Sequence, residues 1–155
     1  MQRKIKVYVI ARISKDFHLW TDKVCDHIEK EFKIFKPKDH NPFSKSHKYF
    51  SKKVYDLDLK FIRSSNIGLI LPEYGRDCAW EAGWYSCSGK PTIIFVDKQT
   101  KWLRDWMVKG GLQYIATINP KTYKILRNDP ILKHKRIILL SKISDLNGLI
   151  KKIGK

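Results

Sequence analysis

The chain has 155 residues, of which 43% are hydrophobic and 12% aromatic, and its 32 Lys and Arg against 15 Asp and Glu give a formal net charge of +17. This length predicts one globular domain over residues 1–155 that is long enough to bury a core. No apolar run is long enough to cross a bilayer, so no membrane partner is expected. The first residues enter a strand pattern without a signal-peptide core, which predicts a cytoplasmic protein.

The positive charge favours partners that carry phosphate, either a nucleic acid or a small nucleotide. Lysines are spread along most of the sequence, and the densest basic tract is at residues 133–136. A lysine-rich solvated surface explains this distribution as well as a nucleic-acid interface does. A basic nucleic-acid-binding module therefore stays an alternative.

Hydrophobic periodicity predicts strands that alternate with helices. In chain order these are a strand at 4–11, a helix at 18–31, a strand at 32–36, a polar loop at 38–47 that is long enough for a lid, a helix at 49–65 and a strand at 67–71. There follow a helix from Asp77 to a stop signal at 88–91, a strand at 92–96, a short helix at 102–107, a strand at 112–118, a short helix at 122–127, an extended run at 136–140 and a helix at 144–153. This alternation predicts a three-layer α/β sandwich, flavodoxin-like or Rossmann-like, with a mainly parallel five-stranded sheet.

Several familiar sites are missing from the sequence. The patterns GxGxxG, GxxxxGK[ST] and GxSxG do not occur, and the five histidines form no HExxH pair. Cys25, Cys78 and Cys87 lack CxxC spacing, so we expect small buried residues and neither a disulfide framework nor a zinc site. No metal and no cofactor are predicted.

Glu81 is the first candidate functional residue. It follows the apolar strand 67–71, Pro72 and a glycine-containing turn, in the first turns of a helix for which Asp77 is the predicted N-cap. Ligands of open α/β sheets bind at this carboxyl edge. Glu81 is therefore either a surface residue placed favourably near a helix N-terminus or a nucleophile or acid/base at a ligand cleft.

Asp58 is the second candidate carboxylate. It borders the apolar stripe of the helix at 49–65 and does not lie on the opposite face. Two interpretations stay open. Asp58 points toward the edge of a cleft, or it forms a surface ion pair with Lys60 or Arg63.

Three blocks of sequence resemble the nucleoside 2-deoxyribosyltransferase family, which includes related nucleoside 5′-monophosphate N-glycosidases. They are the strand KVYVIA at 6–11, the segment DLDL at 56–59 that leads through SSN into IGLIL at 67–71, and GRDCAWEAG at 75–83 followed by GKP at 89–91. Their order and spacing agree with the family pattern over residues 4–97. One position departs from it, because Gly75 stands where the family has an aspartate six residues before its nucleophile.

The resemblance implies roles for individual residues. Glu81 would be the nucleophile, Tyr8 would orient it, and Asp58 would hold the hydroxyls of the sugar. Asp77, four residues before Glu81, either takes over a polar role at the base or sugar or is only a helix cap. Arg12 occupies the turn where phosphate-accepting relatives place basic residues. The family also implies a homo-oligomer, in which a neighbouring subunit completes each site.

The chemistry of other residues suits them to bind the substrate. Trp80, Trp84 or Phe17 could stack on the base, and each is otherwise a core aromatic. Arg12, Lys15 and Arg76 could bind a phosphate together with helix amides, and each is otherwise a solvated loop charge. Glu81 must be ionised to attack, and a helix N-terminus together with a tyrosine hydroxyl favours the charged form.

Together these features predict an enzyme that cleaves the N-glycosidic bond of a (deoxy)nucleoside or nucleoside 5′-monophosphate. The sugar would pass to an acceptor base or to water. The sequence does not determine which base is released, whether the sugar is ribose or deoxyribose, whether the substrate carries a phosphate, or whether the acceptor is a base or water. A glutamate-dependent NAD-cleaving domain of the TIR kind is an alternative, since it also uses a glutamate on a helix of an α/β fold.

Overall fold

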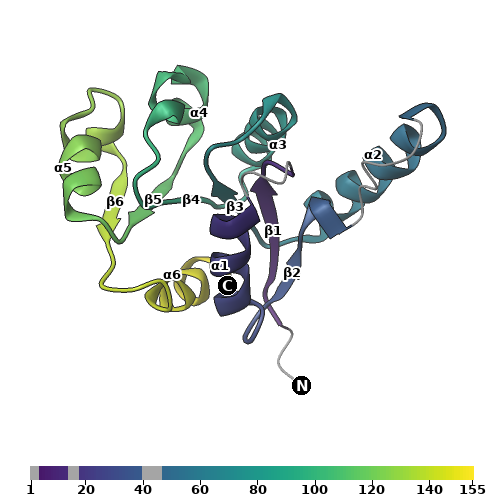
Figure 1. Cartoon of the computed structure of the whole chain (residues 1–155), viewed down its shortest axis with the longest axis horizontal. Helices are drawn as coiled ribbons and strands as arrows, with labels where there is room; N and C mark the ends of the chain where they lie inside the picture. Colours follow the sequence, from purple (N-terminus) through teal and green to yellow (C-terminus); the bar gives the residue numbers. More distant parts are fainter. Residues whose placement is uncertain (1–3, 14–17, 40–46) are drawn as a thin grey trace.

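The computed structural model describes residues 4–13, 18–39 and 47–155. A six-stranded parallel sheet in the order β2-β1-β3-β4-β5-β6 is flanked by helices on both faces (Figure 1). The strands are β1 (Lys6–Ala11), β2 (Lys33–Phe35), β3 (Ile67–Leu71), β4 (Thr92–Val96), β5 (Tyr114–Thr117) and β6 (Arg136–Leu139). The α-helices are α1 (His18–Ile28), α2 (His47–Ser64), α3 (Arg76–Cys87), α4 (Trp106–Gly111), α5 (Pro120–Asn128) and α6 (Asp145–Ile153), and short 3-10 turns lie at Pro37–Asp39, Lys101–Arg104 and Leu132–His134. The predicted three-layer α/β class is confirmed.

Each face of the sheet has its own hydrophobic core. Side chains alternate along β1, so that Val7 and Val9 face α1 and α6, whereas Tyr8 and Ile10 face the other side. That second side is covered by α3, α4, α5 and the C-terminal end of α2. Helices on both sides explain why every residue of β3 and β4 is buried and why, apart from Thr92 at the start of β4, these residues are apolar.

The sheet has one strand more than the five that the sequence predicts. Residues 136–139, expected only as an extended run, form β6 and pair in parallel with β5 from Tyr114↔Arg136 to Thr117↔Leu139. β6 is an edge strand in which the first and last residues are exposed and the middle two are half-buried. It therefore lacks the apolar run that marks the buried strands.

Some helix boundaries also differ from the prediction. The expected helix at 102–107 is a 3-10 turn at Lys101–Arg104 followed by α4. The N-cap of α3 is Gly75, not Asp77, which lies in the first helical turn. The proposed lid falls largely at residues 40–46, outside the described residues.

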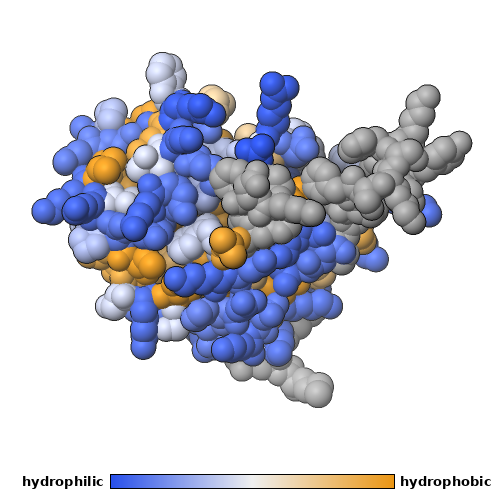
Figure 2. Space-filling model, in the orientation of Figure 1, coloured by the Kyte–Doolittle hydropathy of each residue, from blue (hydrophilic) through white to orange (hydrophobic). Residues whose placement is uncertain are grey.

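The surface of the protein is largely hydrophilic, as its high lysine content predicts. Hydrophilic residues cover much of the face shown in Figure 2, where hydrophobic residues form separate small patches. Cys25 and Cys78 are buried as expected, but Cys87 is exposed at the end of α3, which corrects that prediction. None of the helices in the described part of the chain is both long and apolar enough to cross a membrane.

Candidate active site

The strand order places a natural ligand position between β1 and β3. The chain winds from β1 to β2 on one side and continues from β3 to β6 on the other, so the order reverses at the β1–β3 pair. Ligands of doubly wound sheets bind outside the carboxyl ends of the strands at such a switch point. Arg12 follows β1 there, and α3 begins five residues after the end of β3.

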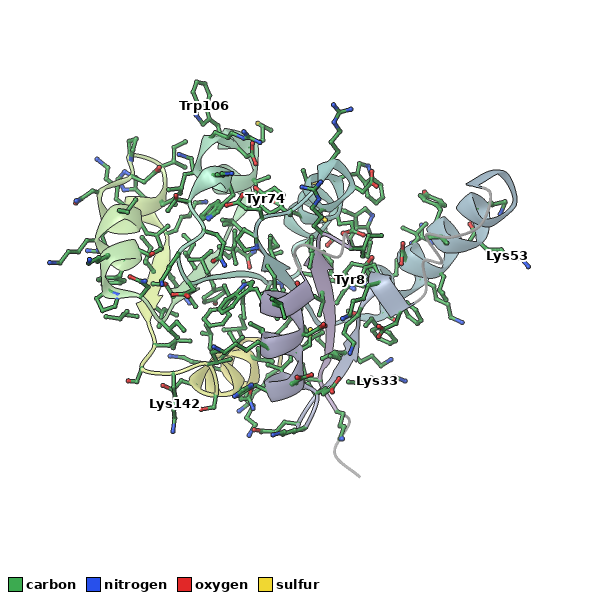
Figure 3. The ribbon with its side chains drawn as sticks, viewed as in Figure 1. Tyr8, Lys33, Lys53, Tyr74, Trp106 and Lys142 are labelled. Carbon is green, nitrogen blue, oxygen red and sulfur yellow. The ribbon has the colours of Figure 1, made fainter. Side chains whose placement is uncertain are left out.

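Tyr8 and Glu81 form a buried hydrogen bond across this switch point. The Tyr8 hydroxyl donates to Glu81 Oε1 over 2.7 Å, although the residues are 73 positions apart. The exposed fraction is 0% for Tyr8 and 8% for Glu81. β1 directs the Tyr8 ring toward α3, and Figure 3 shows Tyr8 on β1 beside that helix. The structure thus brings the predicted nucleophile and the predicted orienting tyrosine together.

Burial controls the protonation of Glu81. Removal from water raises its pKa to about 8; the Tyr8 hydrogen bond opposes this rise, and the negative charges of Asp58 and Asp77 add to it. Burial thus outweighs the tyrosine hydrogen bond and favours the protonated form of Glu81 near neutral pH, whereas attack on a sugar requires the ionised form. Burial and the nearby acids Glu81 and Asp58 also raise the pKa of Tyr8 far above its ordinary value, so its hydroxyl remains a donor.

Asp58 belongs to the same group of side chains. It is half-buried on α2, and its charge acts on both Tyr8 and Glu81. Asp58 thus lies near enough for its charge to act on this pair, and both sequence interpretations of the carboxylate stay open. Asp77 lies one helical turn before Glu81 and is exposed, so it borders the group.

Trp80 lies beside Glu81 and is 53% exposed. It pairs with Tyr55 of α2, which is also 53% exposed, with ring centroids 6.5 Å apart and planes inclined at 50°. Sequence reasoning missed Tyr55. Its position three residues before Asp58, off the apolar stripe, was the available signal. Trp84, by contrast, is half-buried and packs its ring against the edge of Tyr85, and Phe17 lies outside the described residues.

Two of the predicted phosphate-binding residues lie at the carboxyl edge of the sheet. Arg12 follows β1, and Arg76 is the first residue of α3; both are exposed. Gly75 has no side chain with which to cap α3, so helix amides face the same edge as Arg76. Lys15 is outside the described residues.

Two further observations concern other sites. A hollow of about 740 Å³ lies at the opposite, amino edge of the sheet and is lined by residues such as Lys4, Asn66 and Lys151, far from Glu81 in the fold. Among the described residues, no three His, Cys, Asp or Glu side chains gather so as to hold a metal ion.

These features define an α/β protein with a buried tyrosine–carboxyl pair at the switch point of its sheet. No protein-family model and no curated protein matches the chain. Among solved structures, a conserved protein from Enterococcus faecalis V583 aligns with a TM-score of 0.60 at 17% identity, over 97% of this chain and 99% of that one.

Two other similar structures have an activity in their names. The 2-deoxyribosyltransferase from Bacillus psychrosaccharolyticus aligns with a TM-score of 0.60 at 18% identity, over 87% of this chain and 99% of that one. The CMP N-glycosidase BcmB from Clostridium botulinum aligns with a TM-score of 0.50 at 17% identity, over 83% of this chain and 96% of that one. At these identities the likeness establishes a shared Rossmann-like fold, and at that level the predicted resemblance is confirmed.

Proposed function

We propose that this protein cleaves the N-glycosidic bond of a (deoxy)nucleoside or nucleoside 5′-monophosphate, with Glu81 as the nucleophile. The observation that carries the proposal is the buried 2.7 Å hydrogen bond between Tyr8 and Glu81, with Asp58 close enough to affect both groups. The fold shared with a deoxyribosyltransferase and a CMP N-glycosidase supports the same reaction class.

The proposed reaction proceeds in two displacements. Because Tyr8 binds Oε1, Oε2 of ionised Glu81 is the oxygen that attacks the anomeric carbon. The bond between that carbon and the base nitrogen breaks, its electron pair leaves with the base, and a glycosyl ester forms on Glu81. A second base or a water molecule then attacks the same carbon and releases the carboxylate, and the proton that it loses passes to the base that departed with the electron pair. The positive charge that develops on the sugar favours ionised Glu81 at the moment of reaction.

The surrounding residues bind the rest of the substrate. Asp58 accepts hydrogen bonds from sugar hydroxyls, and the exposed Trp80–Tyr55 pair offers aromatic surface for the base. Asp77 borders the site as a polar group for the base or sugar. Arg12, Arg76 and the first amides of α3 supply donors for a 5′-phosphate.

The protein is also proposed to act as a homo-oligomer in the cytoplasm. α2 stands off from the rest of the molecule in Figure 1, and its apolar stripe includes Leu57 and Val54, which follows the Lys53 labelled in Figure 3. A second copy that covers this stripe would lie close to the Trp80–Tyr55 pair and could complete the base site.

Chromatographic detection of free base tests the proposal. Purified protein is incubated with a panel of nucleosides, 5′-monophosphates and NAD, with and without an acceptor base, beside the variants Glu81→Gln and, as a matched surface control, Glu29→Gln. We expect base release by the wild type and the control, and at least a 100-fold loss in Glu81→Gln.

The panel also separates the alternatives. An exchanged base identifies a transferase, and free sugar or sugar phosphate identifies a hydrolase. Nicotinamide release from NAD alone would replace the proposal with the NAD-cleaving alternative. Absence of release from every compound, or full activity of Glu81→Gln, would refute it.

A further inference from the structure

α2 is attached to the rest of the protein near one end. Figure 1 shows the helix projecting away from the sheet, with its C-terminal end beside the sheet; Lys53, in the projecting part, is labelled in Figure 3. At the attached end, Phe61 stacks on Phe35 of β2 with centroids 3.9 Å apart, and Ile62 is buried. Asp58 lies one turn before this attachment. The direction of α2 therefore decides where the Asp58 carboxylate lies.

Lys90 binds the backbone at the attached end. Its ammonium donates to the carbonyl oxygens of Ile62 at 3.2 Å, Arg63 at 2.5 Å and Ser65 at 2.9 Å. The last carbonyls of a helix lack partners within the helix and carry its negative partial charge. A lysine in this position satisfies them and restrains the final turn. Lys90 is itself held over the Trp84 ring of α3, 5.7 Å from its centroid.

Tyr85 adds a second attachment from the helix that carries Glu81. Its hydroxyl donates to the carbonyl of Ile62 over 3.3 Å. Since Tyr85 follows Glu81 by four residues, both side chains leave the same face of α3. The end of α2 is thus fixed by donors from α3 and from the segment just after it.

We propose that Lys90 is a positioning residue: by holding the last carbonyls of α2, it fixes the direction of this helix and keeps Asp58 beside the Tyr8–Glu81 pair. This inference rests on the proposed function, which gives Asp58 its role at the site. The effect of Lys90 on the position of Asp58 can nevertheless be measured without an assay of enzyme activity. A helix cap that only adds stability would leave the surroundings of Glu81 unchanged.

The titration of Glu81 reports on this geometry. The described titratable groups that act on Glu81 or feel its charge are Tyr8 from β1, Asp58 from α2, and Asp77, Cys78 and Tyr85 from α3. Among them, Asp58 is the group that moves with α2. Since its charge raises the pKa of Glu81, displacement of α2 lowers that pKa.

The experiment follows the side-chain carboxyl of Glu81 by ¹³C NMR in protein labelled at glutamate, with the resonance assigned by its loss in Glu81→Gln. We expect Lys90→Met and Asp58→Asn to lower the midpoint of the titration, each by about half a unit or more. In the Asp58→Asn background, Lys90→Met should add no further shift. Lys90→Arg, which keeps charged donors, should restore the wild-type midpoint, and Lys53→Met, an exposed change on the same helix, should not alter it.

Tyr85→Phe removes one hydroxyl and keeps the ring, so it provides a milder variant if Lys90→Met does not fold. It should shift the midpoint in the same direction by a smaller amount. A wild-type midpoint in both variants would overturn the proposal, as would an equal shift with and without Asp58. Neither result depends on base release, so the inference and the proposed function can fail separately.

Discussion

Glu81 is a carboxyl whose burial opposes the charged state that its proposed chemistry requires. Its pKa is raised to about 8, and attack on a sugar carbon needs the ionised form. We therefore predict that kcat/KM of the wild type rises with pH and levels off above about 8. Asp58→Asn should move this rise to lower pH, in addition to weakening the binding of the sugar. A profile that is flat between pH 6 and 9 would contradict Glu81 as the ionising nucleophile.

The same residue makes a prediction about stability. A carboxyl whose pKa is raised on folding stabilises the folded state fully below its unfolded pKa of 4.5, and this contribution is lost as the pH rises through about 8. Glu81→Gln cannot ionise. We expect it to match the wild type at pH 5 and to be more stable at pH 9 by roughly 1–3 kcal/mol, measured by urea denaturation. An equal difference at both pH values would show that Glu81 is not buried as described.

At this scale the sequence alone could propose Glu81, Tyr8 and Asp58, because the resemblance supplied their roles. The sequence placed Glu81 near a helix N-terminus, which favours an ionised carboxyl. It could not show how deeply the side chain is buried, and burial has the opposite effect on the pKa. Tyr55 was missed for a similar reason. Its nearness to Trp80 depends on how α2 crosses α3, and no local pattern encodes that crossing.

At the scale of elements, Gly68 determines how closely α3 packs on β3. A Cβ at this position would lie 3.0 Å from Cγ and Cδ2 of the Tyr85 ring. We predict that Gly68→Val lowers the free energy of unfolding by roughly 2 kcal/mol, because the ring must shift in a close-packed core. Gly83→Ala, on the same helix with open space around it, should instead raise it by about 0.5–1 kcal/mol. Urea denaturation of both variants checks this, and a valine variant as stable as the wild type would contradict it.

Elements buried on both sides could be predicted well. Apart from Thr92 at the start of β4, β3 and β4 are apolar throughout, whereas a strand with one face in solvent would alternate with polar residues. β6 could not be predicted in this way, because an edge strand that is half exposed to solvent has no buried apolar run. The start of α3 was misplaced because side-chain rules for helix caps select Asp77, whereas the backbone caps at Gly75.

At the scale of the whole molecule, the projecting α2 makes a prediction about assembly. If the stripe with Val54 is covered by a second copy, Val54→Glu should give a monomer in light scattering coupled to size exclusion. It should also lose activity, since each site would lack its neighbour. Lys53→Glu, an exposed change next to it, should keep the oligomer. A wild type that is monomeric at the concentrations used for catalysis would contradict the prediction.

The net charge of +17 is also a property of the whole molecule, and it proved less informative than the local motifs. Exposed lysines are spread over several elements from one end of the chain to the other, for example Lys23 of α1, Lys53 of α2, Lys124 of α5 and Lys152 of α6. A field of this kind attracts phosphate compounds to the protein in general, but it does not direct them to one edge of the sheet.

The central place of β1 has a consequence for how the chain folds during synthesis. β1 is made first, but it lies between β2 and β3, so one of its edges has no neighbour until residues 67–71 have left the ribosome. The Tyr8 hydroxyl must wait longer still, because its partner follows 73 residues later. A nascent chain that stops short of α3 therefore lacks the carboxyl group to which the Tyr8 hydroxyl donates in the finished protein. Residues 92–155, which add β4, β5 and β6 to the sheet, are synthesised after Tyr8, Asp58, Asp77 and Glu81.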